Sequence, residues 1–273
     1  MSSACNLCGG TDFAVLETAG DGIRVVRCAR CRLIFLDPLP NFDRTAHYNA
    51  NYYRPWIEEQ RCKRMALWAK RAELLERFAP IGQLLDVGCG DGSFLLAARE
   101  RGWRVVGTEV SQWAVHTLRD TPGLTILQGD LLQIDHLERS FDVVTMWHVL
   151  EHMHRPLQTL VSARKLLTDK GILFVAVPNA GFTLLRIAYP VARLRRLRYY
   201  TPGERELHLH HFTPDTLRAM LEKAEFRLLF EGIDENALRP VNLLLELTAK
   251  AVRRRTGACW SEAMLVVASK AGT

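Results

Sequence analysis

Apolar residues along this chain gather in short runs, and between the runs they recur at the three- and four-residue spacing of helices. Seven runs read as buried strands: Leu84–Val87, Trp103–Glu109, Leu124–Gln128, Phe141–Trp147, Gly171–Val177, Phe226–Gly232 and Ala263–Ser269. Helical spacing follows the first run over Ser93–Arg101 and returns near Arg155. Strands that alternate with helices predict a doubly wound α/β domain.

The first run leads into a turn that carries three glycines at alternate positions, Gly88, Gly90 and Gly92. A loop with so few side chains lets a ligand lie against the backbone, and ligands of α/β sheets bind at the carboxyl ends of the strands. Asp86 lies near this end of the first strand. Glu109 ends the second strand, where its carboxylate is able to accept hydrogen bonds from both hydroxyls of a ribose.

This pattern resembles the glycine motif E/DxGxGxG of the class I S-adenosylmethionine-dependent methyltransferases. The resemblance implies a seven-stranded Rossmann-like sheet whose last strand runs antiparallel between its neighbours. It also implies that the glycines cradle the methionine end of the donor, that Glu109 binds the ribose and that Asp130 binds the adenine edge. The residues expected to bind S-adenosyl-L-methionine are Asp86, Gly88, Cys89, Gly90, Gly92, Glu109, Val110 and Asp130.

Two other interpretations of the glycine turn have to be weighed. A dinucleotide site requires GxGxxG, but Ser93 stands where the last glycine of that motif belongs, so pyrophosphate binding is the weaker interpretation. A tight turn can also be rich in glycine for packing alone. The neighbouring strands and carboxylates favour the methyl donor over both.

Four of the seven cysteines form two CxxC pairs, and 19 residues separate Cys8 from Cys28. This spacing is typical of a zinc ribbon, in which four thiolates close a tetrahedral Zn²⁺ site and hold together a piece of about 35 residues. We expect a structural zinc ion, because a closed site leaves no position for a substrate. The alternatives are two disulfides or a redox pair. The expected ligands are Cys5, Cys8, Cys28 and Cys31.

The composition along the chain predicts three parts. Residues 1–36 form the zinc ribbon, residues 37–80 an aromatic connector with a linking helix over Ile57–Phe78, and residues 81–273 the methyltransferase domain. An insertion over residues 180–212 is expected to cap the acceptor pocket. The connector either folds over the cofactor site or seals the domain interface. Together these parts resemble the zinc-ribbon methyltransferases of bacterial polysaccharide and sugar-modification clusters.

Two histidine clusters follow strands of the predicted sheet. His148 to His152 (HVLEH) comes after the fourth strand, where the acceptor pocket of this family opens, and His208 begins the sequence HLHHF after the fifth. A hydroxyl acceptor needs a base, and the ordinary pKa of histidine, about 6.5, suits that work. His148, His152 and His208 are therefore candidate catalytic residues, with His148 the first candidate for the base or an acceptor contact.

Alternative roles for the same residues remain open. Glu151 and His152 could cap or anchor the next helix, and quinone-biosynthesis methyltransferases carry a similar Glu-His pair there. His208 could pin a lid through backbone hydrogen bonds, or share a metal ion with His211. The first cluster also spells HxxEH, an inverted zinc-peptidase motif. A peptidase would need this motif inside a helix, whereas here it comes directly after a strand.

Two basic amphipathic segments contribute much of the formal net charge of +6. Phe182–Tyr200 contains five arginines and no acidic residue, and residues 242–255 end in three more arginines. Such helices suit an anionic or lipid-linked acceptor, or a peripheral membrane contact through residues 182–200. A solvated helix face and a nucleic-acid surface are the alternatives.

The apolar fraction of 48% is enough for a sizeable core, and the first residues lack the features of a signal peptide. No apolar run approaches the ~20 residues that span a membrane, so we expect a cytoplasmic enzyme. The predicted reaction is O-methylation of a small, glycan-like or phosphate-bearing acceptor, and C- and N-methylation stay open. RNA methylation is the main alternative, although the chain has Thr145–His148 where exocyclic amino methylation commonly uses Asn/Asp-Pro-Pro-Tyr. A non-catalytic binding module would predict a broken glycine loop, and this loop is intact.

Overall fold

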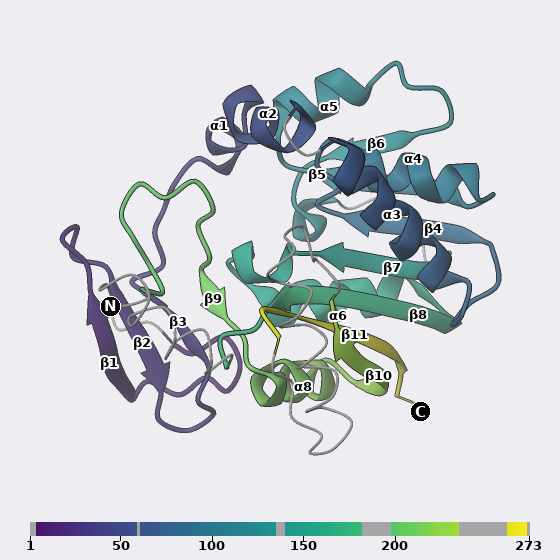
Figure 1. Cartoon of the computed structure of the whole chain (residues 1–273). Helices are drawn as coiled ribbons and strands as arrows, with labels where there is room; N and C mark the ends of the chain where they lie inside the picture. The colour runs from purple at the N-terminus through teal and green to yellow at the C-terminus, as the bar shows by residue number, and fades with distance from the viewer. Residues whose placement is uncertain (1–3, 59–60, 135–139, 182–197, 235–260, 272–273) are drawn as a thin grey trace.

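The computed structural model describes residues 4–58, 61–134, 140–181, 198–234 and 261–271 (Figure 1). Most of the expected basic segment at 182–200, and all of the one at 242–255, lie outside the described residues. Within the described residues, no helix combines the length and the apolar character needed to cross a membrane.

The main sheet has seven strands in the order β10-β11-β8-β7-β4-β5-β6. Their bounds are β4 Gln83–Val87, β5 Arg104–Glu109, β6 Thr125–Gln128, β7 Phe141–Trp147, β8 Leu167–Pro178, β10 Phe226–Ile233 and β11 Ala263–Lys270. Strand β11 pairs antiparallel with both β10 and β8, while β4 to β8 pair in parallel. The predicted Rossmann-like sheet and the antiparallel position of its last strand are confirmed.

Alternate residues of the central strand belong to two different hydrophobic cores. Leu84 packs with Phe94 and Leu95 on one face of the sheet, whereas Leu85 belongs to the core that includes Leu160 and Leu217 on the other. This alternation follows from the two-residue period of a strand. Phe94 and Leu95 belong to α4 Ser93–Glu100, Leu160 to α6 Pro156–Leu166 and Leu217 to α8 Pro214–Lys223. The domain also contains α3 Arg61–Leu75 and α5 Gln112–Leu118.

Strand β4 lies between β5 and β7. From β4 the chain first adds β5 and β6 on one side, and then returns to add β7 and β8 on the other. In doubly wound sheets such a reversal opens a crevice at the carboxyl ends of the strands, because neighbouring helices cover opposite faces. The glycine turn follows β4 at this point. The fold therefore places the predicted cofactor loop at the topological switch point.

The amino-terminal residues form a second, antiparallel sheet (Figure 1). Its strands are β1 Phe13–Thr18, β2 Arg24–Cys28, β3 Ile34–Asp37 and β9 His210–His211. In the register of this sheet Phe35 pairs with His210 and Ile34 with His211. The sequence HLHHF thus supplies the fourth strand of the amino-terminal sheet, a pairing that the sequence did not predict.

The connector contains two short helices, α1 Arg44–His47 and α2 Ala50–Glu58, before α3. Of the linking helix expected over Ile57–Phe78, the described residues place Ile57 and Glu58 in α2 and Arg61–Leu75 in α3. Met65 is 59% exposed, because α3 turns the side of Arg64, Trp68 and Arg71 toward the pocket described below. Leu75 is fully buried, as its position predicts.

Helix α8 begins with a capping box at Thr213. The Thr213 hydroxyl accepts a hydrogen bond from the Thr216 N–H, and the Thr216 hydroxyl accepts one from the Thr213 N–H. Such reciprocal bonds satisfy donors that have no partner inside the helix. After the helix, Glu225 has φ 60°, in the left-handed region that favours glycine.

Candidate active site

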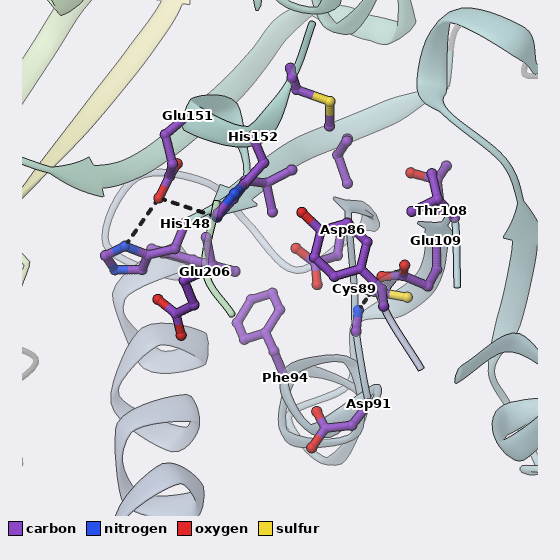
Figure 2. A pocket seen from close by; sticks show the side chains of 18 of the residues that line it. Asp86, Cys89, Asp91, Phe94, Thr108, Glu109, His148, Glu151, His152 and Glu206 are labelled. Atoms are coloured by element: carbon purple, nitrogen blue, oxygen red, sulfur yellow. Dashed lines mark hydrogen bonds and ion pairs between the residues drawn. The ribbon is translucent and has the colours of Figure 1, made fainter. Parts of the chain in front are cut away.

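A pocket of about 420 Å³ opens at the carboxyl ends of β4, β5 and β7. Figure 2 shows Asp86, Cys89 and Glu109 on one side of it, and His148, Glu151 and His152 on the other. The connector closes part of its wall through Tyr48, Tyr52 and Tyr53. All the predicted donor residues except Gly92 therefore line one cavity together with the three candidate catalytic histidines.

The three glycines of the turn all have left-handed backbone, with φ 70° at Gly88, 56° at Gly90 and 72° at Gly92. Space is also limiting, since a Cβ atom at Gly88 would lie 2.8 Å from a methyl group of Val149. A Cβ atom at Gly90 would lie 3.3 Å from the ring of Tyr53. Glycine is required by both the conformation and the close approach of neighbours.

The Glu109 carboxylate joins the glycine turn to the start of α5. Its Oε2 accepts a hydrogen bond from the Gly90 N–H and its Oε1 accepts one from the Ser111 N–H, each at 2.8 Å. Burial raises the pKa of Glu109, and these backbone donors offset only part of that effect. A carboxylate has about four lone-pair sites, and these two bonds occupy two of them, so Glu109 is able to hold the turn and to contact a ligand.

Asp86 is a second buried carboxylate at this end of the pocket. Its Oδ1 accepts a hydrogen bond of 2.6 Å from the Thr145 hydroxyl. Burial raises the pKa of Asp86 to about 7, against the opposing effects of Thr145 and Arg71. No arginine or lysine of the described residues forms an ion pair with Asp86 or Glu109. This side of the pocket therefore suits a cationic ligand.

Asp130, the residue expected at the adenine edge, is bound by the connector. Its Oδ2 lies 2.6 Å from Arg44 Nη2, and its Oδ1 accepts a hydrogen bond from the Leu132 N–H. Nearby, the ring of Tyr53 stacks on Trp113 with 5.3 Å between centroids. Of the two roles predicted for the connector, the structure shows the first, since it folds over the cofactor side of the pocket.

His148 is held between two carboxylates. Its Nε2 lies 2.8 Å from Asp234 Oδ2 and its Nδ1 lies 3.7 Å from Glu151 Oε1. Burial opposes the charged form, but the contacts with Asp234 and Glu151 prevail and raise the pKa of His148 to about 9. The imidazole therefore carries a positive charge at neutral pH.

Asp234 continues this network to Arg71, whose Nη2 lies 2.5 Å from Asp234 Oδ2. The guanidinium of Arg71 lies 4.8 Å from the ring centroid of Trp68 and 4.5 Å from that of Trp147. Sequence reasoning missed Asp234 and Arg71. An acidic residue directly after β10, a strand parallel to β8, was the available signal, because it falls at the same edge of the sheet.

The two histidine clusters of the sequence meet in space. The ring centroids of His152 and His208 lie 4.9 Å apart, and Glu151 lies beside both rings. Burial and the neighbouring His152 lower the pKa of His208 to about 4, so this imidazole is neutral at physiological pH. His210 points elsewhere, toward Asn6 of the amino-terminal segment.

The HxxEH arrangement of a peptidase does not form. His148 has left-handed backbone with φ 57°, and Leu150–His152 forms only a short 3₁₀ turn, η2. Two histidines of a zinc-peptidase motif would share one face of an α-helix. Here His148 faces Asp234 and His152 faces Glu151 and His208 instead.

The four expected zinc ligands converge at one point of the amino-terminal sheet. Their sulfur atoms all lie within 4.8 Å of one another, with 3.4 Å between Cys5 and Cys31 and 3.5 Å between Cys8 and Cys28. A disulfide requires about 2.05 Å. A tetrahedral zinc ion with Zn–S bonds of about 2.3 Å places its sulfurs about 3.8 Å apart, so the arrangement fits zinc.

Residues 57–230 match a family described as a methyltransferase domain. Among curated proteins, the chain is 31% identical over 110 residues to a ubiquinone biosynthesis O-methyltransferase of Histophilus somni, covering 37% of this chain and 46% of that protein. It is 28% identical over 119 residues to a probable S-adenosylmethionine-dependent methyltransferase of Mycobacterium tuberculosis, covering 41% and 43%. The matches thus span less than half the length of these relatives.

Solved structures share the fold. A SAM-dependent methyltransferase of Archaeoglobus fulgidus superposes with a TM-score of 0.55 at 18% identity, covering 80% of this chain and all of that one. A methyltransferase from a complex with a methyltransferase activator of Haloferax volcanii gives 0.57 at 17% identity, covering 82% and 97%.

Proposed function

The chain belongs to the methyltransferase domain family, and we propose that it transfers the methyl group of S-adenosyl-L-methionine (SAM) to a small acceptor. The observation that carries this proposal is the pair of buried carboxylates, Asp86 and Glu109, beside the left-handed glycine turn. SAM carries positive charges on its sulfonium and ammonium groups. A pocket wall with two carboxylates that have no cationic partner of their own is complementary to such a ligand.

The proposed donor contacts follow the positions of the side chains in the pocket. The turn at Gly88, Gly90 and Gly92 leaves room for the methionine end beside Asp86, and Glu109 keeps free lone pairs for the ribose. Val110 and Asp130 line the part of the pocket proposed for the adenine. Arg44 already holds one oxygen of Asp130, so the adenine amino group and Arg44 would share this carboxylate.

The acceptor is proposed to bind on the side of His148, His152 and His208, and to react through a hydroxyl group. The pKa of His148, about 9, leaves the ring protonated at neutral pH, so it has no lone pair with which to take a proton and is proposed to orient the acceptor instead. His208 is neutral and offers a lone pair. O-methylation is also the reaction in the name of the Histophilus somni relative.

Among acceptors, a hydroxyl-rich, glycan-like molecule fits the described wall best. Glu151, Glu206 and Glu262 line the pocket, and carboxylates accept hydrogen bonds from hydroxyl groups. Two arginines of the wall already form ion pairs, Arg64 with Asp91 and Arg71 with Asp234, so they do not favour an anionic acceptor. A phosphate-bearing acceptor depends on the basic segments, which lie outside the described residues.

We also propose that residues 1–36 form a zinc ribbon whose ion is bound by the four clustered cysteines. Four thiolates leave the ion closed and structural. Metal analysis of the purified chain is expected to give one zinc per molecule, and Cys28→Ser to lose it together with the signal of a folded amino-terminal sheet. Cys62→Ser, at an exposed cysteine away from the cluster, is the matched control. Free cysteines in the described chain are consistent with a reducing, cytoplasmic location.

Donor binding tests the function directly. Calorimetric titration of the zinc-loaded chain with SAM and with its demethylated product should show one binding event for each. A folded, metal-loaded protein that takes up neither compound would overturn the proposal. A screen of hydroxylated acceptors then follows formation of the demethylated product, with RNA as the comparison at low and high salt.

A further inference from the structure

We propose that Glu151, His152 and His208 form a binding site for one divalent cation on the acceptor side of the pocket. The ligand atoms of the three side chains all lie within 4.8 Å of one another. They come from two segments far apart in the chain, η2 after β7 and the residues before β9. This site is separate from the cysteine cluster, which has only sulfur ligands.

The strongest evidence is the environment of Glu151. Its side chain is 1% exposed, and neither carboxylate oxygen has a hydrogen-bond partner. A buried carboxylate without hydrogen bonds is rare, because its desolvation is expensive. The charged His148 ring attracts Glu151 but forms no hydrogen bond with it, so the compensation is incomplete. The nearest ring nitrogens lie at 3.7 Å in His148 and 4.0 Å in His152, beyond hydrogen-bond distance. A cation between Glu151 and the histidines would supply the missing interaction.

His152 is already oriented as a metal ligand. Its Nδ1 lies 2.7 Å from the carbonyl oxygen of Leu207, so Nδ1 carries the proton and the lone pair belongs to Nε2. That nitrogen is the one that faces Glu151 Oε1. A histidine whose second nitrogen donates to a carbonyl is the usual arrangement around protein-bound metals, because the bond fixes the tautomer and the ring.

The backbone holds the two segments together. The Leu209 N–H donates to the carbonyl oxygen of Glu151 at 2.9 Å, next to His208. The distances are close to those of a bound site, since two ligands about 2.1 Å from one ion lie at most about 4.2 Å apart. Glu151 Oε1 and His152 Nε2, at 4.0 Å, already satisfy this limit. Binding needs only small side-chain movements.

The donor set indicates the class of ion. Two imidazoles with one carboxylate suit first-row divalent metals such as manganese, iron, cobalt or zinc rather than calcium. Three protein ligands leave coordination positions open toward the pocket, which all three residues line. An acceptor hydroxyl bound there would lose its proton more readily. This last role rests on the proposed function, whereas binding of the ion does not.

Manganese is the probe for the test, because it prefers nitrogen and oxygen ligands and does not compete well with zinc for thiolates. The full zinc-loaded chain is titrated with Mn²⁺, and free Mn²⁺ is followed by electron paramagnetic resonance. We expect uptake of one Mn²⁺ per chain. Glu151→Gln and His208→Gln should each weaken binding at least about tenfold, while His116→Gln, at an exposed histidine of α5, should not.

Each variant is first compared with the wild type by thermal melting and by its zinc content. Should Glu151→Gln fail to fold, His208→Gln decides the result. No uptake by the wild type, or unchanged affinity in either folded variant, overturns the site. A chain that binds SAM but not Mn²⁺ contradicts the metal site and leaves the proposed function standing. A chain that binds Mn²⁺ but not SAM supports the metal site and contradicts the proposed function.

Discussion

His148 Nε2 lies 2.8 Å from the same Asp234 oxygen that receives Arg71. One carboxylate thus orients both a pocket histidine and a buried guanidinium. We expect His148→Ala to leave donor affinity unchanged and to slow methyl transfer by about 10²-fold or more, since a positioned acceptor contact is lost. Initial rates with a screened acceptor, beside calorimetric donor titrations, measure the two effects. Wild-type rates would remove His148 from the reaction.

Asp234→Asn should resemble His148→Ala without removing the ring. The amide cannot hold the charged imidazole and the Arg71 guanidinium as the carboxylate does, so turnover falls while the donor still binds. Asp215→Asn is the control, because Asp215 is an exposed acid in the first turn of α8. Equal melting temperatures for the two variants would show that the loss is not one of folding. A variant with full activity would contradict the positioning role.

Glu109→Ala is expected to weaken binding of SAM strongly, and also to loosen the glycine turn. The substitution leaves the Gly90 and Ser111 N–H groups without their acceptor. Each lost bond costs on the order of 1 kcal/mol. Calorimetry measures the affinity and urea unfolding the stability, with Glu100→Ala at the exposed end of α4 as the control. Unchanged donor affinity would refute the binding role of Glu109.

The raised pKa of Asp86 makes a prediction about pH. Between the ordinary value of about 3.9 and the native value of about 7, the folded protein holds a proton that the unfolded chain has released. Stability therefore falls as the pH rises through this window. Asp86→Asn removes this dependence, and its amide oxygen still accepts from Thr145.

We expect Asp86→Asn to be more stable than the wild type at pH 8, by on the order of 1 to 4 kcal/mol, and the advantage to shrink toward pH 5. The same variant should bind SAM less tightly, because it removes a negative charge from the donor wall. Urea unfolding at both pH values measures the first effect. A stability difference independent of pH would contradict the native pKa.

Glu225 offers a test of backbone strain. It follows the C-cap of α8, Ala224, and has φ 60°, a conformation that a glycine adopts without cost. Glu225→Gly should stabilise the protein by about 0.5 to 1 kcal/mol, reduced slightly by loss of the exposed ion pair with Arg164. Glu222→Gly, near the end of the helix proper, should destabilise it by about 1 kcal/mol. Equal effects of the two substitutions would contradict this explanation.

Local patterns account for most of the sheet. All seven strands of the main sheet follow from runs such as Leu84–Val87, because the period of a strand and the turn residues around it are features of adjacent positions. Strand β8 begins at Leu167, four residues before the predicted Gly171, since the apolar run marks only its buried part. The Thr213 cap was likewise predictable from neighbouring residues.

Contacts between distant segments could not be read in the same way. The pairing of β3 with β9, and the approach of Asp234 to His148, join residues that share no local period. Glu151 illustrates the difference, since its sequence neighbours suggested a helix anchor, whereas its environment is set by His208, which lies 57 positions later. Tertiary folding alone creates such clusters.

Strand β9 comes from the later part of the chain but belongs to the amino-terminal sheet, and this has a practical consequence for truncation of the chain. A fragment that begins after residue 36 would lack most of β3, the strand with which β9 pairs. The segment at His208, directly before β9, would then lose this support. We therefore expect neither part to fold fully without the other. A shortened catalytic fragment should lose its acceptor side first, and attempts to graft the amino-terminal ribbon onto another scaffold would have to carry residues 208–212 along.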